Sequence, residues 1–536
     1  MRKSATLQSL AIWCLLCLVL WSPADYCNAQ QDSVKISGSP EFGNTRNQLL
    51  ERMQYRQGKF FRNDFIRDYS PFDERTFKLE SEPSFGNELL YRDQGREKQI
   101  TLTMKENFVT ATLIPLLGET FYANESGTPY WKRSNGLAVS GSVGEDVTFY
   151  AKAIDNVLRG ASPNMISSFS SQPGYVTSLT NSKGYDYDDA EMQLGFRFGQ
   201  ANLFFEKIRN TWGYGRGGQL VFSERAPSYP QIRASVQLFH NVKFTVLAEF
   251  LNSRIVDSSR SYIDYTDGTL TDFREVDRSK YLFAHILEYS PIEELNLAIG
   301  EEIIVSDSFT PEYMLLPFTF YHNLYIQAGG TENENIWGGG RYTFKNVGSI
   351  YSTLYVDDFN IDQRFYIVAG TFGGTLIDID NRKLDLTLEY TALRPFVYAN
   401  NTTALSRTSN GYPLGDWLGQ NGERMQAWVD YRPIPELWFS ASYMNIRKGL
   451  DGTTFQEYGV PASQIGDVKF LDGPLLKRSE FNLRGRWEMH AGLVADFSYR
   501  LVTQKDSVVN RFPSFSNRSY ISVALKLNIF DQNDEW

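Results

Sequence analysis

The most regular hydrophobic pattern lies near the end of the chain, where a strand is predicted over residues 520–530. A repeat of two indicates a β-strand whose faces meet different surroundings. In a soluble sandwich the apolar face would point into the core, and in an outer-membrane barrel it would point to lipid. This strand alone leaves both options open. Its aliphatic face contains Ile521, Val523, Leu525, Leu527 and Ile529, and its opposite face contains Ser522, Ala524, Lys526 and Asn528.

From about Phe108 onward the same alternation recurs, for example over residues 191–198, 383–390, 424–431 and 493–501. In each segment one face is compatible with lipid. The other face carries charges of both signs, which suits a water-filled lumen.

The connections between these strands alternate between short and long, which is typical of outer-membrane barrels and has no reason to occur in a soluble sandwich or propeller. Tight turns are predicted near Gly144, Gly199, Asn241, Pro291, Asn346, Asp380, Pro433 and His490. Longer connections are predicted near residues 117–134, 155–190, 253–279, 306–334, 398–422, 448–478 and 505–517.

One stretch breaks the alternation, because Gln219–Glu224 could be drawn as an extra strand between two turns on the same side. Parity therefore predicts that residues 211–230 form one extracellular excursion. Since Leu220–Phe222 is too apolar to stand in water, this loop is expected to fold into the barrel. The fold class is then an all-β transmembrane antiparallel barrel of about 18 strands, with both termini in the periplasm.

The first part of the chain has a different composition. Residues 1–29 read as a secretory signal peptide cleaved after Ala29, with a lipoprotein signal ending at Cys27 as the alternative. Residues 30–106 are expected to be a partly irregular periplasmic region with a short helix over 44–57, and residues 107–536 the barrel. All three cysteines, Cys14, Cys17 and Cys27, lie in the signal segment, so the mature chain should have none.

Composition excludes several kinds of function. The formal net charge of −10 argues against a nucleic-acid partner. The chain has four histidines and no His-Glu-x-x-His motif, so we expect no metal site, no cofactor and no catalytic residues. After the signal segment the chain contains no run of 18 apolar residues, so we expect no transmembrane helix.

Two glycine-rich loops are the candidate ligand sites, for polysaccharide binding or for constriction of the lumen. Flat rings can stack on sugar rings, and arginine can bind carboxylates of an acidic glycan through two bonds. The alternative is that both are ordinary glycine-rich loops, and a dinucleotide site at Gly213, Gly215 and Gly218 is disfavoured because no helix follows. The first loop offers Trp212, Tyr214, Arg216, Glu224 and Arg225, and the second offers Asp416, Trp417 and Glu423.

These loops also carry a resemblance. Residues 212–223 (WGYGRGGQLVFS), Ala226-Pro227, residues 230–233 (PQIR), residues 355–359 (YVDDF) and the loop over 413–423 resemble the Wzi family of capsule assembly proteins. The resemblance implies an 18-stranded outer-membrane barrel with a periplasmic N-terminal part, acting as a lectin and not as an enzyme. Its expected partners are outer-membrane lipid, capsular or other extracellular polysaccharide, and the barrel assembly machinery. Barrels of this class are usually recognised by the last strand and a terminal aromatic residue; Phe530 and Trp536 are the candidates, and Phe530 is favoured because the alternation stops there.

Two rival functions share this architecture. One is a substrate-selective porin or a transporter of small or hydrophobic molecules, which needs a continuous pathway. The other is an outer-membrane lipid hydrolase, which needs a Ser/His pair on the outer wall and for which His285 and His322 are the candidate bases.

Overall fold

The computed structural model describes most of the chain from residue 102 onward and short pieces before it. The described residues are 33–36, 64–67, 75–78, 102–106, 108–124, 129–160, 169–181, 184–266, 269–310, 312–316, 318–329, 332–360, 365–379, 383–434, 436–449, 468–490, 492–507 and 514–529. The expected signal peptide, the helix over 44–57 and Phe530 lie outside these residues.

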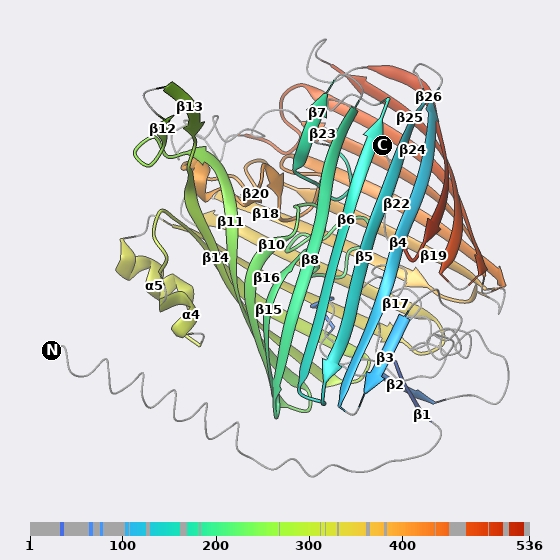
Figure 1. Cartoon of the computed structure of the whole chain (residues 1–536), viewed down its shortest axis with the longest axis horizontal. Coiled ribbons are helices and arrows are strands. Elements are labelled where there is room, and N and C mark those ends of the chain that lie inside the picture. Colours follow the sequence, from blue (N-terminus) through green and yellow to red (C-terminus); the bar gives the residue numbers. More distant parts are fainter. Residues whose placement is uncertain are drawn as a thin grey trace.

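Eighteen antiparallel strands of the described chain close into a barrel, as the sequence predicted (Figure 1). Each wall strand pairs with its neighbours in chain order, and β26 pairs with β4 to close the ring. The wall strands are β4 (Val109–Asn124), β5 (Tyr130–Val143), β6 (Val147–Arg159), β8 (Gly184–Phe198), β9 (Ala201–Ile208), β10 (Tyr229–Phe239), β11 (Val242–Val256), β14 (Asp277–Ile292), β15 (Leu295–Ser306), β16 (Asn333–Phe344), β17 (Gly348–Asn360), β18 (Phe365–Leu376), β19 (Leu384–Leu393), β22 (Gly422–Ile434), β23 (Leu437–Gly449), β24 (Leu475–His490), β25 (Leu493–Asp506) and β26 (Phe515–Leu527).

Shorter elements decorate this wall. β3 (Leu102–Glu106) extends the edge of β4, and β7 (Thr177–Asn181) pairs with the start of β8. β1 (Ser33–Ile36) pairs with β2 (Arg75–Lys78), and the long connections contain β12 (Tyr262–Thr266), β13 (Thr269–Arg274), α4 (Glu312–Leu315), α5 (Tyr321–Ala328), η5 (Thr403–Leu405), β20 (Thr408–Ser409) and β21 (Tyr412–Pro413). No helix in the described part of the chain is long and apolar enough to cross a membrane.

The predicted tight turns lie where the alternation placed them, and most of the predicted long connections also do. Each predicted tight turn falls at or beside a junction between two consecutive wall strands. Gly144, Gly199 and Asn346 each adopt a positive φ, the backbone conformation that tight hairpins require. The predicted tight turns therefore lie at one end of the barrel. The predicted long connection over 117–134 is wrong, because β4 runs to Asn124 and β5 begins at Tyr130, which leaves only five residues between them.

The two faces of the wall also follow the predicted pattern. Large apolar side chains such as Met192, Leu388, Met425 and Val523 are exposed on the outside. Their sequence neighbours on the inner face are polar and mostly buried, so the lumen is packed and charged.

The last strand differs from its prediction at its end. The strand stops at Leu527, and Ile529 is buried beside Ile114 and Leu116 instead of continuing the outer face. The cause is Asn528, whose φ of 57° turns the chain and whose side-chain amide donates to the Pro115 carbonyl at 2.9 Å. Asparagine tolerates this left-handed conformation better than other non-glycine residues do.

Part of the N-terminal region lies within the barrel. The Phe65 side chain is fully buried, and its backbone N–H donates to Glu288 of β14 at 2.8 Å. Its carbonyl accepts a hydrogen bond from Gly213 at 2.9 Å, and Asp64 pairs with Arg341. Residues 64–67 therefore occupy the lumen together with the loop that follows β9.

Candidate functional site

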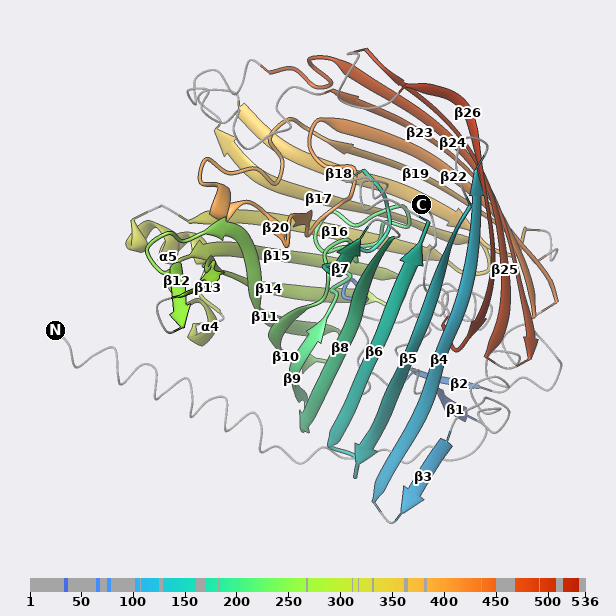
Figure 2. The same cartoon turned by 45° about the horizontal axis from the view of Figure 1, so that its top comes forward.

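The chain between β9 and β10, residues 209–228, turns into the lumen, and we call it the in-folded loop. Figure 2 shows loop segments inside the ring of strands. Residues 219–224 form no strand of the wall, as parity predicted; Trp212 and Phe222 only form an isolated bridge. Leu220, Val221 and Phe222 are almost completely buried.

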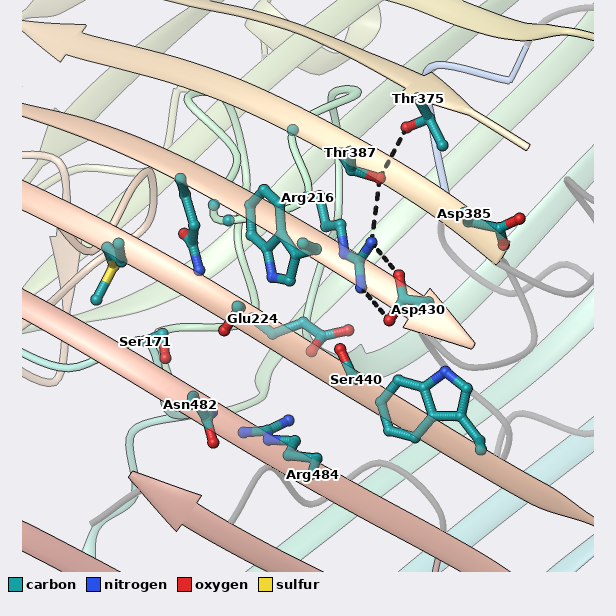
Figure 3. A pocket seen from close by; sticks show the side chains of 18 of the residues that line it. Ser171, Arg216, Glu224, Thr375, Asp385, Thr387, Asp430, Ser440, Asn482 and Arg484 are labelled. Atoms are coloured by element: carbon teal, nitrogen blue, oxygen red, sulfur yellow. Dashed lines mark hydrogen bonds and ion pairs between the residues drawn. The ribbon is translucent and has the colours of Figure 1, made fainter. Parts of the chain in front are cut away.

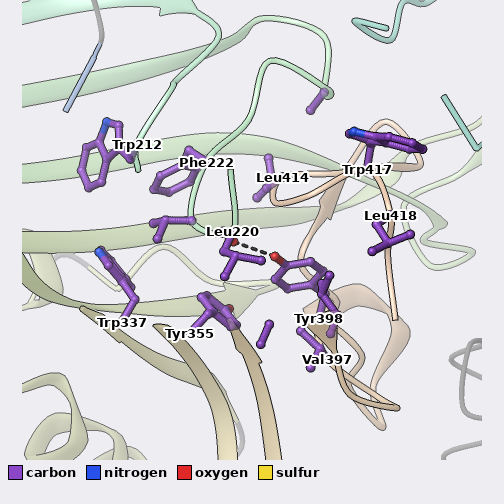
Figure 4. Packing of buried hydrophobic residues seen from close by; sticks show 14 of the residues in the cluster. Trp212, Leu220, Phe222, Trp337, Tyr355, Val397, Tyr398, Leu414, Trp417 and Leu418 are labelled. Atoms are coloured by element: carbon purple, nitrogen blue, oxygen red, sulfur yellow. Dashed lines mark hydrogen bonds between the residues drawn. The ribbon is translucent and has the colours of Figure 1, made fainter. Parts of the chain in front are cut away.

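The base of the in-folded loop is an apolar core in the centre of the barrel (Figure 4). The Trp212 ring packs edge-on against Phe222 with centroids 5.0 Å apart, and lies 6.3 Å from the ring of Trp337 on β16. Tyr398 donates its hydroxyl to the Leu220 carbonyl at 2.7 Å. Trp212 is therefore a buried core residue.

The tip of the in-folded loop is held by Glu389 on the inner face of β19. This carboxylate accepts the backbone N–H of Arg216 at 2.6 Å and of Gly217 at 3.0 Å, and the Tyr351 hydroxyl at 2.7 Å. The glycines make the approach possible, because a Cβ on Gly218 would lie 2.4 Å from an Asp416 oxygen. A buried carboxylate is stabilised by several donors of this kind.

Arg216 reaches past the tip to the inner wall (Figure 3). Its guanidinium makes two bonds to Asp430 of β22, at 2.7 and 3.1 Å, and a third to Thr387 at 3.1 Å. It also lies over the Trp428 ring, 4.8 Å from the centroid. The arginine is thus fixed in position while one edge of it faces open space.

A second inner loop, residues 394–421 between β19 and β22, supports the first. Asp416 is fully buried and binds Arg424 through bonds of 2.9 and 3.0 Å. The Trp417 indole N–H donates to the Gly217 carbonyl at 2.7 Å. The buried Arg407 pairs with Glu302 of β15, which ties this loop to a strand four places along the wall from β19.

Glu224 and Arg225 lie at the far end of the in-folded loop. Burial raises the pKa of Glu224, while nearby Arg209 opposes the shift. Burial lowers the pKa of Arg225 to about 10. The Arg225 side chain donates to the Gln172 carbonyl and lies over the Tyr412 ring at 4.9 Å, so it joins three separate loops.

A cavity of about 290 Å³ lies between the in-folded loop and the inner wall of β17 to β26. Above it are the in-folded loop, residues 171–173 and Trp417. Below, it extends toward the end of the short turns. Its lining combines tryptophan rings with charged and hydroxyl groups of the wall, including Trp428, Trp438, Ser440, Asn482, Arg484, Arg486, Asp496 and Lys526.

The predicted site residues divide into three groups. Those lining the cavity are Tyr214, Arg216, Glu224, Arg225 and Trp417. Trp212 and Asp416 are buried in packing contacts. Glu423 lies on the outer face of β22, where it pairs with Arg447 and accepts the Tyr390 hydroxyl at 2.7 Å.

The wall residues of the cavity were not among the sequence candidates. Arg484 and Arg486, two positions apart on β24, share its inner face, and Trp438 lies on the neighbouring β23. For Trp428, Asp496 and Lys526 the signal was present in the alternation, because each falls on the polar face of a predicted strand, whereas no strand was predicted over Trp438, Arg484 or Arg486.

Two histidines that could have served a hydrolase have carboxylate partners. His285 and Glu301 lie 2.9 Å apart, and His322 and Glu334 also lie 2.9 Å apart. Among the described residues, no group of three or more potential metal ligands occurs.

Comparison with known proteins identifies a family and a solved structure of similar fold. The family described as capsule assembly protein Wzi matches residues 116–504. No curated protein matches the chain. Among solved structures, the chain is similar to Wzi of Escherichia coli, described as an outer membrane protein involved in group 1 capsule assembly and a carbohydrate-binding β-barrel. The TM-score is 0.54 at 14% identity, covering 91% of this chain and 98% of that one, which establishes the shared fold.

Two further structures are more distant. Pseudomonas aeruginosa OprD has a TM-score of 0.42 at 11% identity, with 78% of this chain and 94% of that chain covered. Acinetobacter baumannii OccAB4 has a TM-score of 0.43 at 11% identity, with 79% and 98% covered.

Proposed function

Because the chain belongs to the Wzi family of capsule assembly proteins, we propose that it binds capsular polysaccharide and keeps it at the cell surface. The chain is an outer-membrane β-barrel of that family, with an apolar outer face around a polar lumen. The short turns then face the periplasm and the long connections face the outside. In this proposal the protein acts by binding, without catalysis.

The observation that carries the proposal is the composition of the cavity. Three tryptophans, Trp417, Trp428 and Trp438, line the cavity together with three arginines, Arg216, Arg484 and Arg486. Saccharides are recognised by this pairing, since their C–H faces pack on aromatic rings and their hydroxyls and carboxylates bind fixed polar groups. Arg216 is already held by Asp430 and Thr387, so little side-chain entropy is lost when a ligand contacts it.

The segments packed inside the lumen disfavour the alternative that the protein is a porin. The in-folded loop, the second inner loop and residues 64–67 pack against one another and against opposite walls in one buried core. An open channel would need these contacts to part. A polysaccharide-binding barrel does not need an open channel.

Binding of purified protein to a glycan array that includes capsular polysaccharides tests the proposal. Trp438→Ala should weaken binding about threefold to tenfold, the range expected for loss of one aromatic contact. The matched control is Trp487→Ala, which removes an exposed tryptophan from the outer face of the neighbouring strand β24. Binding of no glycan would overturn the function, whereas glycan binding unaffected by Trp438→Ala and Arg484→Ala would move the site elsewhere.

A further inference from the structure

In the connection between β15 and β16, the described residues 307–310, 312–316 and 318–329 fold outward instead of inward. Figures 1 and 2 both show α4 and α5 outside the ring of strands, beside β14 and β15. From Phe309 to Gly330 this segment contains a single formally charged residue, Glu312, and is rich in leucine, methionine and aromatic residues. A loop of that composition is not suited to water.

The segment packs along the outer face of the wall. The Phe309 ring lies 5.3 Å from that of Tyr281, and Tyr313 lies 5.7 Å from Phe283. Phe318 stacks on Phe244 at 4.7 Å. Because Phe244 is only two residues from the start of β11 at a short turn, the segment extends over much of the height of the wall.

A polar socket on the outer wall holds the segment. His285 of β14 and Glu301 of β15 are register partners on the outer face, and both side chains are largely covered. Glu301 accepts the backbone N–H of Tyr321, the first residue of α5, at 2.7 Å. The buried Tyr321 ring lies 4.5 Å from the His285 ring, so α5 shields a pair that lipid would not tolerate.

The surface that the segment turns away from the wall is apolar. Phe318, Phe320 and Ile326 are 61%, 71% and 61% exposed. They continue the exposed apolar face of the wall, which includes Leu287 and Ile299 nearby. Turn and helix bonds pair backbone groups within the segment, as from Leu316 N–H to the Glu312 carbonyl at 3.0 Å, which hydrocarbon surroundings require.

We propose that the described part of residues 307–329 forms an outer clasp that is immersed in the membrane beside the barrel wall, where Phe318, Phe320 and Ile326 contact lipid acyl chains. The barrel then meets lipid through a second protein layer at this sector, and the Glu301 socket fixes that layer to the wall. The partner is lipid because the exposed face is continuous with the lipid-facing wall and because the segment has almost no charge.

Spin labels on single cysteines test this in reconstituted phospholipid bilayers. The chain's three cysteines lie at positions 14, 17 and 27, in the expected signal segment, so labels at Phe318→Cys, Phe320→Cys and Ile326→Cys are unique in the mature protein. Each label should collide with oxygen more than with a water-soluble nickel chelate. Ile299→Cys on the lipid-facing wall is the positive control, and Ser258→Cys, exposed in another long connection, is the aqueous control.

Two outcomes overturn the proposal. Labels that match Ser258→Cys would place the clasp in water. The other outcome is that the labels are shielded from both reagents and show spin–spin line broadening that disappears on dilution with unlabelled protein. That result would mean that a second copy covers the clasp.

A second variant tests the socket itself. Glu301→Ala should leave the barrel folded, checked by its heat-modifiable migration on gels, because the wall ladder does not use this side chain. The spin label at residue 320 should become mobile, and its collision with the nickel chelate should rise toward that of the label at Ser258→Cys. An unchanged label would show that Glu301 does not fix the clasp.

Discussion

The in-folded loop and the outer clasp leave the same end of the barrel and fold in opposite directions. The in-folded loop carries Arg209, Arg216, Glu224 and Arg225, and its charges meet polar partners within the barrel. For example, Arg209 binds Asp189 at 2.8 Å and Glu191 at 2.6 Å. The clasp carries one charged residue between Phe309 and Gly330 and packs ring against ring.

The difference shows how a barrel directs its long connections. The inner face of the wall offers many carboxylates and arginines, so a charged loop gains partners by turning inward. The outer face offers apolar side chains with few polar sockets, so an apolar segment gains by turning outward. Glycine content adds to this, because Gly217 lets the in-folded loop lie close to Gln426 and Glu389 of the wall, and Gly218 lets it lie close to Asp416 of the second inner loop.

The largest effect should come from removing the in-folded loop. Replacing Gly213–Val221 with a short glycine-serine linker removes the tip bound to Glu389 and joins the cavity to the outside. Barrels of this strand number can hold an aqueous channel when nothing fills them. We expect conductance in planar bilayers to rise from near baseline to a steady open level.

The control for this deletion is a linker in place of residues 262–274, the β12–β13 hairpin, which lies outside the ring of strands. It should leave conductance at baseline. If the in-folded loop deletion also stays closed, residues 64–67 and the second inner loop suffice to block the lumen.

A smaller, local effect should follow from Glu389→Ala. The backbone donors of Arg216 and Gly217 and the buried Arg424 each lose an acceptor. Unpaired buried donors of this kind cost about 1–3 kcal/mol. Hydrogen exchange of the loop amides should accelerate accordingly, with exchange in the wall strands unchanged.

Glu145→Ala, in an exposed position of a short turn, is the matched control for Glu389→Ala. It should change hydrogen exchange neither in the in-folded loop nor in the wall strands. Faster exchange throughout the wall would instead mean that Glu389 stabilises the barrel as a whole.

Sequence reasoning predicted the wall better than the site, for a physical reason. A strand between lipid and lumen must alternate, so residues such as Met425 and Asp430 identify their own faces. The contents of the lumen depend on long-range contacts, such as Arg216 with Asp430, that no local pattern contains. Glu423 shows where prediction of the site from sequence fails. Its glycine-rich neighbours suggest a loop, but the register of β22 places its side chain on the outer face.

The lack of charge in the clasp indicates that it could fold outward. The sequence does not indicate the socket that holds it. His285 and Glu301 are separated by a hairpin and become partners only through the register of β14 and β15. Their joint contact with Tyr321 depends on tertiary packing alone.

Phe318→Arg tests the environment of the clasp energetically. A cation on a lipid-facing surface of a barrel costs about 2–4 kcal/mol at the bilayer midplane and less near the interfaces. The free energy of unfolding in phospholipid vesicles should therefore fall by about 1–3 kcal/mol. Ser258→Arg, exposed in another long connection, should leave it unchanged. Equal effects of the two substitutions would mean that the clasp does not contact lipid.

The smallest expected effect concerns the one carboxyl of the in-folded loop whose pKa is raised. Burial makes the Glu224 carboxyl easier to protonate in the folded loop than in the unfolded chain. Its contribution to stability is therefore fully present below the ordinary glutamate pKa and is lost as pH rises through the folded pKa. Glu224→Gln keeps the size of the side chain but removes this charge. The variant and the parent should melt at the same temperature in acid, and the variant should melt higher at neutral pH, measured by heat-modifiable migration across a pH series. Glu145→Gln, exposed in a short turn, should show no such divergence. A variant that melts lower at neutral pH would mean that attraction between Glu224 and Arg209 outweighs the burial of the carboxylate.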